Sequence, residues 1–255
     1  YRSNGGLIMA LSHSPKIVTD GLVLCLDAGD GKAYSGSGTT WTDRSGQGNH
    51  GTLVNGPTFD SGNGGSIDFD GSNDYVGINN TVGNLGTENF TISIVFKTTT
   101  VASPATFFAK SIGSTPTVNY GWLINQASSG ELGFAVASAL GSWGTTGSYS
   151  IKTVSGQINN GEWKIVNIVG DRTQSDISIY INGVQKSLQA YAGKAAFSTV
   201  GNITNTYTLR VGSESDDASP YPIDGSIAVV HIYNKALTDA EVLQNFNAQR
   251  GRFGL

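Results

Sequence analysis

The chain has 255 residues with 35 glycines and only 13% charged residues, a composition that favours an all-β fold of short strands and tight turns. The net charge is −4 and no run of Lys or Arg occurs, which argues against binding to nucleic acid. The single cysteine, Cys25, excludes an intrachain disulfide, and no apolar run approaches the roughly 18 residues of a membrane-spanning helix. No Pro-rich or charged linker divides the chain, so we expect an extended arm over residues 1–16 and one domain over residues 17–255.

Short apolar runs, and apolar residues that alternate with polar ones, predict a series of strands along the chain. The first is the run GLVLCLDAG, in which Cys25 is expected to be a buried and inert thiol. The most regular alternation lies in FTISIVFKT and in the pair GEWKIVNIVGD and DISIYINGVQK. Strands are expected at 21–29, 66–70, 76–78, 90–98, 120–126, 131–138, 161–171, 176–186, 208–213 and 225–233.

Two turn signatures connect these strands. Asn182-Gly183 predicts a type I′ hairpin turn. The acidic stretch SIDFDGSNDYVGI could be a calcium loop or a turn, but its spacing does not fit an EF-hand. If Gly71 stood at the sixth position, Ser66 would be first and Gly77 last, and neither supplies a carboxylate. We therefore expect a strand–turn–strand element, with Asp and Asn placed for the backbone geometry of the turn.

One helix is predicted, at residues 238–250. Thr238 and Glu241 have the spacing of a capping box at its start. Arg250-Gly251 is a plausible end for it. The residues expected to hold its entry and to form its apolar stripe are Leu237, Val242, Leu243 and Phe246. We expect this helix to be a structural cap on the sheet.

Several of these motifs together resemble one family. The stretches are GLVLCLDAG, WTDRSGQGNHGTL, SIDFDGSNDYV, FTISIVFKT, the hairpin GEWKIVNIV…SIYINGV and DGSIAVVHIYNKALTDAEV. They are similar to the concanavalin A-like lectin/glucanase superfamily, and within it to the laminin-G-like jelly rolls. The resemblance implies a sandwich of two antiparallel sheets of about six or seven strands each, with the first and last strands paired. The opening residues 12–29 also resemble the start of such domains in virion proteins of marine tailed phages.

An enzymatic activity is not expected from the residues present. The glucanases of this superfamily carry the motif E-x-D-x-x-E, and retaining hydrolysis needs two carboxyls about 5–5.5 Å apart. The nearest approach here is Glu214-Ser215-Asp216, in which Ser219 replaces the third acid. The histidines are scattered, and His231 is expected to be a core or sheet-face residue.

Calcium is the one cofactor that the sequence suggests. Lectins and laminin-G-like domains often hold this ion at the rim of the sandwich, and hard cations need several converging oxygens. The candidate ligands are Asp171, at the end of a strand, and the neighbouring Asp216 and Asp217 in a loop. Two interpretations stay open for these acids, a calcium site and ordinary solvated loop carboxylates, and the sequence favours the second.

Carbohydrate sites place an exposed aromatic ring against the sugar. Trp143 and Tyr149 lie in the glycine-rich stretch LGSWGTTGSY, and Tyr221 lies between two prolines, so these three are the candidates for stacking. Packing is an equal alternative for Trp143. Trp122 and Trp163 lie in strand patterns and are expected in the core.

Three functions are compatible with these features. The first is a non-enzymatic phage virion protein, a capsid decoration or fibre-associated module, that folds in the host cytoplasm. Its N-terminal arm would contact other virion proteins, and its jelly roll would face host-surface polysaccharide. The alternative is a secreted or cell-surface lectin module, and the third is an endoglycanase. Formation of a homo-oligomer stays open.

Overall fold

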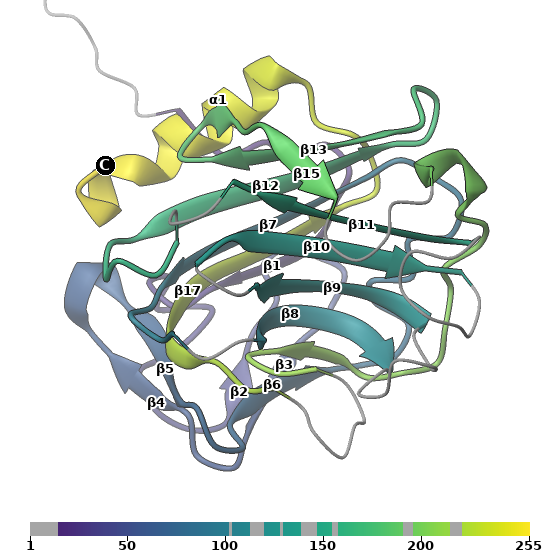
Figure 1. The fold of residues 1–255 in the computed structure, drawn as a ribbon. Helices are drawn as coiled ribbons and strands as arrows, with labels where there is room; N and C mark the ends of the chain where they lie inside the picture. Colours follow the sequence, from purple (N-terminus) through teal and green to yellow (C-terminus); the bar gives the residue numbers. More distant parts are fainter. Residues whose placement is uncertain are drawn as a thin grey trace, which may run out of the picture.

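The computed structural model describes residues 15–101, 104–112, 120–127, 130–138, 147–154, 158–190, 196–214 and 221–255. These residues form two antiparallel sheets packed face to face, with one α-helix outside the sandwich (Figure 1). The predicted all-β sandwich with one C-terminal helix is therefore confirmed. No helix in the described part of the chain is long and apolar enough to span a membrane.

Sheet A contains eight strands in the described residues. Their spatial order is β14 (Val184–Gln185), β13 (Asp176–Ile181), β12 (Lys164–Asp171), β7 (Phe90–Lys97), β17 (Asp224–Tyr233), β5 (Ser66–Asp70) and β4 (Thr58–Asp60), and β1 (Leu22–Asp27) also pairs with β17. In the register of that last pair, Cys25 lies opposite His231. The expected pairing of the first and last strands is confirmed.

Sheet B contains nine strands in the same described ranges. Their order is β15 (Leu188–Ala190), β11 (Ser148–Thr153), β10 (Leu132–Ala137), β9 (Tyr120–Gln126), β8 (Ala105–Ile112), β16 (Leu209–Val211), β6 (Tyr75–Ile78), β3 (Gly51–Val54) and β2 (Thr40–Trp41). Both sheets have more strands than expected. Of these, β2, β4, β14 and β15 have only two or three residues each, too few to show an alternation. The sequence also did not predict the longer strands β3, β8 and β11.

The core lies between the two sheets. Phe96 of β7 stacks on Phe107 of β8 with ring centroids 4.1 Å apart, so the two sheets meet through aromatic rings. Trp122 is fully buried in this core, as the sequence predicted. Three 3₁₀ turns complete the described elements, at η1 (Gly62–Gly64), η2 (Phe197–Thr199) and η3 (Arg250–Phe253).

The acidic stretch 66–78 is a strand–turn–strand element, as predicted. Its first half is β5 in sheet A and its second half is β6 in sheet B, so the turn carries the chain from one sheet to the other. The carboxylate of Asp70 accepts a hydrogen bond from the Ser72 N–H at 2.8 Å, and that of Asp74 accepts one from the Asp70 N–H at 3.2 Å. Gly71 has φ +75°, a backbone conformation that favours glycine. These acids therefore serve the turn.

The hairpin turn at Asn182-Gly183 is also confirmed. Both residues have positive φ, +53° and +74°, as a type I′ turn requires. The Asn182 side chain accepts a hydrogen bond from the Ile165 N–H at 2.9 Å and so ties the turn to strand β12. A Cβ atom on Gly183 would lie 2.9 Å from the ring of Phe246, so the turn also makes close contact with the helix.

Helix α1 (Asp239–Gln249) begins with the predicted capping box between Thr238 and Glu241. Its predicted apolar stripe is partly wrong, because Leu243 is 49% exposed and Asn245 is fully buried in its place. The Asn245 side chain accepts a hydrogen bond from the Val18 N–H at 2.7 Å and donates one to the Tyr233 hydroxyl at 3.1 Å. A polar residue can replace an apolar one here because both ends of its amide have partners.

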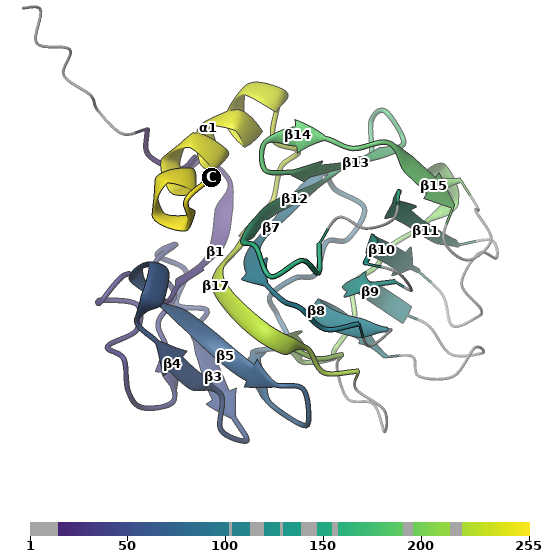
Figure 2. The same ribbon diagram turned by 60° about the vertical axis from the view of Figure 1, so that its left-hand side comes forward.

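Helix α1 lies outside the sandwich, next to β1 (Figure 2), and its Val242 packs with Cys25 and Tyr180 on the outer face of sheet A. A row of polar side chains runs across this face. Cross-strand pairing places these side chains side by side in the order Tyr180, Asn167, Ser93, His231 and Cys25. Burial lowers the pKa of His231 to about 4 and raises the pKa of the Cys25 thiol to about 12. Both groups are therefore neutral at physiological pH, and the expectation of a buried cysteine is confirmed.

This burial of His231 predicts a loss of stability in mild acid. The native imidazole stays neutral down to about pH 4, whereas the unfolded chain takes up a proton near pH 6.5. The contribution of His231 is thus present above pH 6.5 and is lost as the pH falls toward 4, by roughly 3 kcal/mol in the free energy of unfolding. We expect the free energy of unfolding of His231→Gln to fall less between pH 7 and pH 4 than that of the wild type. Urea denaturation at a series of pH values measures both. Parallel curves for the two proteins would contradict the assignment.

Candidate functional site

Of the site residues that the sequence suggested, the structure describes Tyr149, Asp171 and Tyr221. Trp143, Asp216 and Asp217 lie outside the described residues. Tyr221 is half-buried, has φ +44°, and its carbonyl accepts a hydrogen bond from the Thr106 N–H at 2.8 Å. These contacts fix the backbone of Tyr221 against strand β8.

The prediction for Tyr149 as an exposed aromatic is wrong. Tyr149 is 5% exposed and lies in β11, where its ring packs on Phe197 with centroids 5.6 Å apart. Burial also raises the pKa of its hydroxyl. The glycines around it suggested a loop, but the strand extends to Ser148 and its alternation turns Tyr149 toward the core. A buried ring has no free face for a sugar.

Asp171 ends strand β12 and organises the turn that follows it. Its Oδ1 atom accepts hydrogen bonds from the Thr173 hydroxyl at 2.6 Å, the Thr173 N–H at 2.9 Å and the Gln174 N–H at 3.2 Å. The bond from the Thr173 hydroxyl is the main reason why the pKa of Asp171 is below its usual value. No group of three or more His, Cys, Asp or Glu residues gathers into a metal site within the described ranges.

A concave rim groove lies at one end of the sandwich, and its described lining contains none of the residues expected at a site. Its first cavity has a volume of about 370 Å³ and is bounded by strand β1, the end of β17 and the loop 79–90. A second cavity of about 500 Å³ shares Glu88, Asn89 and Asn234 with the first and extends toward Arg172 and Lys235. We call the two cavities together the rim groove.

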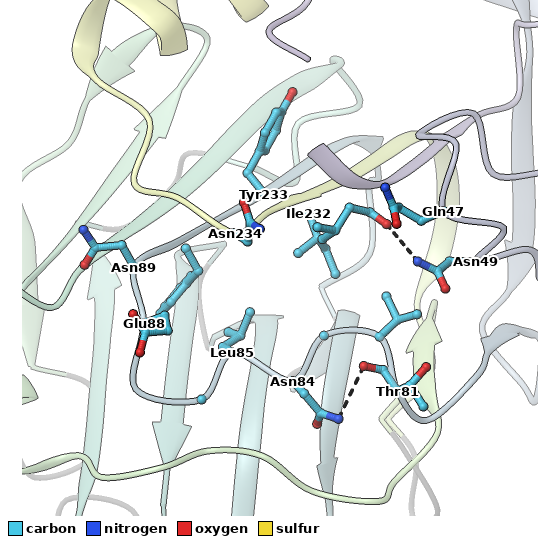
Figure 3. Close-up of a pocket in the computed structure, with 15 residues that line it drawn as sticks. Gln47, Asn49, Thr81, Asn84, Leu85, Glu88, Asn89, Ile232, Tyr233 and Asn234 are labelled. Carbon is cyan, nitrogen blue, oxygen red and sulfur yellow. Dashed lines mark hydrogen bonds between the residues drawn. The ribbon is translucent and has the colours of Figure 1, made fainter. Parts of the chain in front are cut away.

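Amide side chains surround the first cavity (Figure 3). Gln47 and Asn49 lie on one side, Glu88 and Asn89 on another, and Asn84 and Thr81 below them in this view. The apolar part of the lining includes Val82, Leu85, Phe90 and Ile232. The lining therefore combines hydrogen-bond donors and acceptors with an apolar surface, the usual character of a small-molecule site.

Three of these amides are held in place by the backbone. Asn49 donates a hydrogen bond to the Val23 carbonyl at 2.9 Å, Asn84 accepts one from the Asn205 N–H at 3.1 Å, and Asn89 accepts one from the Arg172 N–H at 2.7 Å. By contrast, the side chains of Gln47 and Asn234 make no hydrogen bond within the described residues, so their amides are available to a ligand.

The loop 79–90 is anchored by side chains from other elements. The buried Lys110 of β8 donates hydrogen bonds to the carbonyls of Asn80 at 2.7 Å and Tyr207 at 2.6 Å. The Trp122 indole donates to the Gly83 carbonyl at 2.8 Å. A groove wall fixed in this way loses little conformational entropy when a ligand binds.

The sequence contained a signal for this groove. The segment 79–90 holds four asparagines between two strands, and amides at strand ends commonly line sites in loops. Gln47 and Asn234 come from parts of the chain that show no such pattern, and only folding brings them to the same cavity.

Paired carboxylates for glycoside hydrolysis are not found in the rim groove. Glu88 is the one carboxyl side chain in the described lining of the two cavities, whereas hydrolysis uses two. Glu214, the first residue of the partial glucanase motif, is 2% exposed and accepts a hydrogen bond from the Ser111 hydroxyl at 2.9 Å. Glu214 is therefore a buried, hydrogen-bonded residue that does not line the rim groove.

Unfolding measurements with calcium and with EDTA test the assignment of Asp171 to the turn. We expect Asp171→Ala to lower the free energy of unfolding by about 1–2 kcal/mol through loss of the turn hydrogen bonds, equally with calcium or with EDTA. Asp176→Ala is a matched control, because Asp176 lies directly opposite in the same hairpin. Thermal unfolding checks both variants. A calcium-dependent rise in Tm that the wild type shows and Asp171→Ala lacks would instead make Asp171 a metal ligand.

The fold is shared with several solved binding domains. The binding domain of Paraclostridial Mosquitocidal Protein 1 superposes with a TM-score of 0.65 at 18% identity, covering 90% of this chain and 52% of that one. The binding domain of botulinum neurotoxin DC superposes in its complex with SialylT (TM-score 0.60) and in its complex with rat synaptotagmin II (TM-score 0.63). In each complex the identity is 18%, covering 91% of this chain and 52% of that one. This chain thus spans about half the length of those chains.

No curated protein matches the sequence. The sequence pattern of one family, Laminin_G_3, described as the concanavalin A-like lectin/glucanases superfamily, matches residues 70–243. That match covers well over half of the 255 residues and includes strands β6 to β17. The chain belongs to the concanavalin A-like lectin/glucanases superfamily.

Proposed function

We propose that this protein is a non-catalytic carbohydrate-recognition module and that the rim groove is its binding site. The observation that carries the proposal is the set of amide side chains around an apolar surface, on a loop fixed by Lys110 and Trp122. Each amide can donate and accept, which matches the paired hydroxyls of a sugar. The apolar lining suits the C–H faces of a sugar ring.

The structural neighbours support a binding function. One of them, the binding domain of botulinum neurotoxin DC, has been solved in complex with SialylT and with rat synaptotagmin II. At 18% identity these neighbours share the fold with this chain, and their ligands are not transferred to it. The choice of a saccharide rests on the chemistry of the groove.

The groove amides provide the test of this proposal. We expect the double variant Gln47→Ala, Asn234→Ala to weaken saccharide binding by about tenfold or more, since each lost hydrogen bond costs about 1 kcal/mol. Neither amide is hydrogen-bonded within the described structure, so stability should change little. Isothermal titration with a saccharide chosen from a glycan array measures the effect.

The control is Gln189→Ala, which removes an exposed amide from the edge strand β15, outside the groove. Equal loss of affinity in this control and in the double variant would argue against the rim groove. If the wild type binds no saccharide on the array, the proposed function itself fails.

We further propose that the module is displayed on a phage particle, folds in the host cytoplasm, and is attached through its N-terminal arm. The resemblance of residues 12–29 to virion proteins supports this setting. The base of the arm is tied to the helix, because the Lys16 carbonyl accepts a hydrogen bond from Gln244 at 2.8 Å and the Val18 N–H donates one to Asn245 at 2.7 Å. The chain before residue 15 therefore starts from a fixed point beside α1.

Truncation tests this attachment. Deleting residues 1–14 keeps the contacts of Lys16 and Val18, so the domain should unfold at the same temperature as the full chain. Association with phage particles, measured by co-sedimentation, should be lost. Retained association would exclude the arm as the anchor. Saccharide binding without any association to particles would favour the alternative of a secreted or cell-surface lectin.

A further inference from the structure

Three charged side chains line the rim groove among its described residues, and they differ in what they offer a ligand. Arg172 and Lys235 lie in the second cavity, and Glu88 is shared by both cavities. The neighbouring amides are neutral. The charge preference of the groove therefore depends on which of these three groups is free to act on a ligand.

The guanidinium of Arg172 is hydrogen-bonded to backbone carbonyls. Its NH1 group donates a hydrogen bond to the Val200 carbonyl at 2.7 Å, and NH2 is 3.3 Å from each of the carbonyls of Gly86 and Gly201. Its charged face also stacks over the Phe197 ring at 4.4 Å. These contacts fix the guanidinium in the wall between loop 79–90 and the segment around residue 200, with NH1 and NH2 directed at carbonyls. Its Nε atom is buried and makes no hydrogen bond within the described residues.

The ammonium of Lys235 is neutralised by two carboxylates. Its Nζ atom lies 2.8 Å from a carboxylate oxygen of Asp20 and 2.8 Å from one of Glu241. These two bonds raise the pKa of Lys235, with the bond to Asp20 as the larger cause. An anionic ligand that approaches this cation would also meet the two carboxylates that hold it.

Glu88 stands at the junction of the two cavities and is exposed. The one contact seen for its carboxylate in the described residues is a long hydrogen bond from the Thr87 hydroxyl, at 3.4 Å. No cation is paired with it there, so its charge acts directly on a ligand in the groove. In the close-up of the site, its side chain lies beside Asn89 and opposite Gln47 (Figure 3).

We propose that the rim groove selects uncharged oligosaccharides and rejects acidic ones, with Glu88 as the specificity-determining residue. The inference rests on the proposed function of the groove. A uronate carboxylate or a sulfate would meet the unpaired Glu88 and two cations whose terminal nitrogens already bond to protein oxygens. A neutral sugar would place its hydroxyls on Gln47 and Asn234 and could donate a hydrogen bond to Glu88. The two adjoining cavities, about 370 and 500 Å³, suit a ligand of more than one ring.

The experiment compares neutral and acidic oligosaccharides on the full chain. Oligosaccharides of β-glucan and mannan serve as the neutral probes, and those of alginate and polygalacturonate as the acidic probes. For the wild type we expect the acidic probes to bind at least about fivefold more weakly in low salt, because like charges a few ångströms apart repel even in water. High salt should narrow this difference.

Two substitutions of Glu88 test whether this residue causes the preference for neutral probes. Glu88→Gln keeps the shape and a hydrogen-bonding group and should bring the two classes of probe within about twofold of each other, and Glu88→Lys should favour the acidic probes. Glu162→Gln is the matched control, because Glu162 is an exposed carboxylate outside the groove, paired with Lys164. It should keep the wild-type ratio.

The outcomes separate this inference from the proposed function. Neutral and acidic probes that bind the wild type equally, or acidic probes that bind more tightly, would overturn the selectivity while leaving the groove as a saccharide site. A ratio that does not change in either Glu88 variant would overturn the assignment to Glu88. Binding of neither class would refute the proposed function and the inference together.

Discussion

Strand β17 pairs with three other strands and so holds sheet A together. Its residues Ser226–Tyr233 pair with β7 on one side, while on the other side its first half pairs with β5 and its second half with β1. The last strand thereby joins the beginning of the chain to its middle. Because such long-range pairs close large loops, they form only if the apolar faces of all four strands are buried together.

The direction of β17 also places the parts that follow it. The chain leaves the strand at Asn234 and enters α1 within five residues, so the helix must lie back across the outer face of sheet A. That contact buries a row of polar groups and ties the base of the N-terminal arm to Asn245. The same strand end brings Ile232 and Asn234 to the rim groove. Stability and the candidate site thus share one strand.

The rim groove depends on anchoring from outside its own loop. Lys110 and Trp122 come from sheet B and hold the carbonyls of loop 79–90, while Arg172 reaches the same loop from the β12–β13 turn. Carbonyls held by buried donors do not need to reorganise when a ligand arrives. Glu88 is the one unpaired charge in the described lining of the groove. The two cations nearby are bonded to protein oxygens, Arg172 to carbonyls and Lys235 to carboxylates.

Patterns in the sequence were enough to predict several local elements: the alternating strands β7, β12 and β13, the Asn182-Gly183 turn, the acidic turn at 70–74 and the capping box of α1. Each of these depends on contacts between near neighbours, which leave a pattern in the chain. The sequence did not show that Tyr149 is buried, that Asn245 takes the place of Leu243 beneath the helix, or that Gln47 and Asn234 line one groove. Those features arise where segments far apart in the chain pack together. The exposure of a side chain there depends on its neighbours in space, and these neighbours cannot be read from residue type and spacing along the chain.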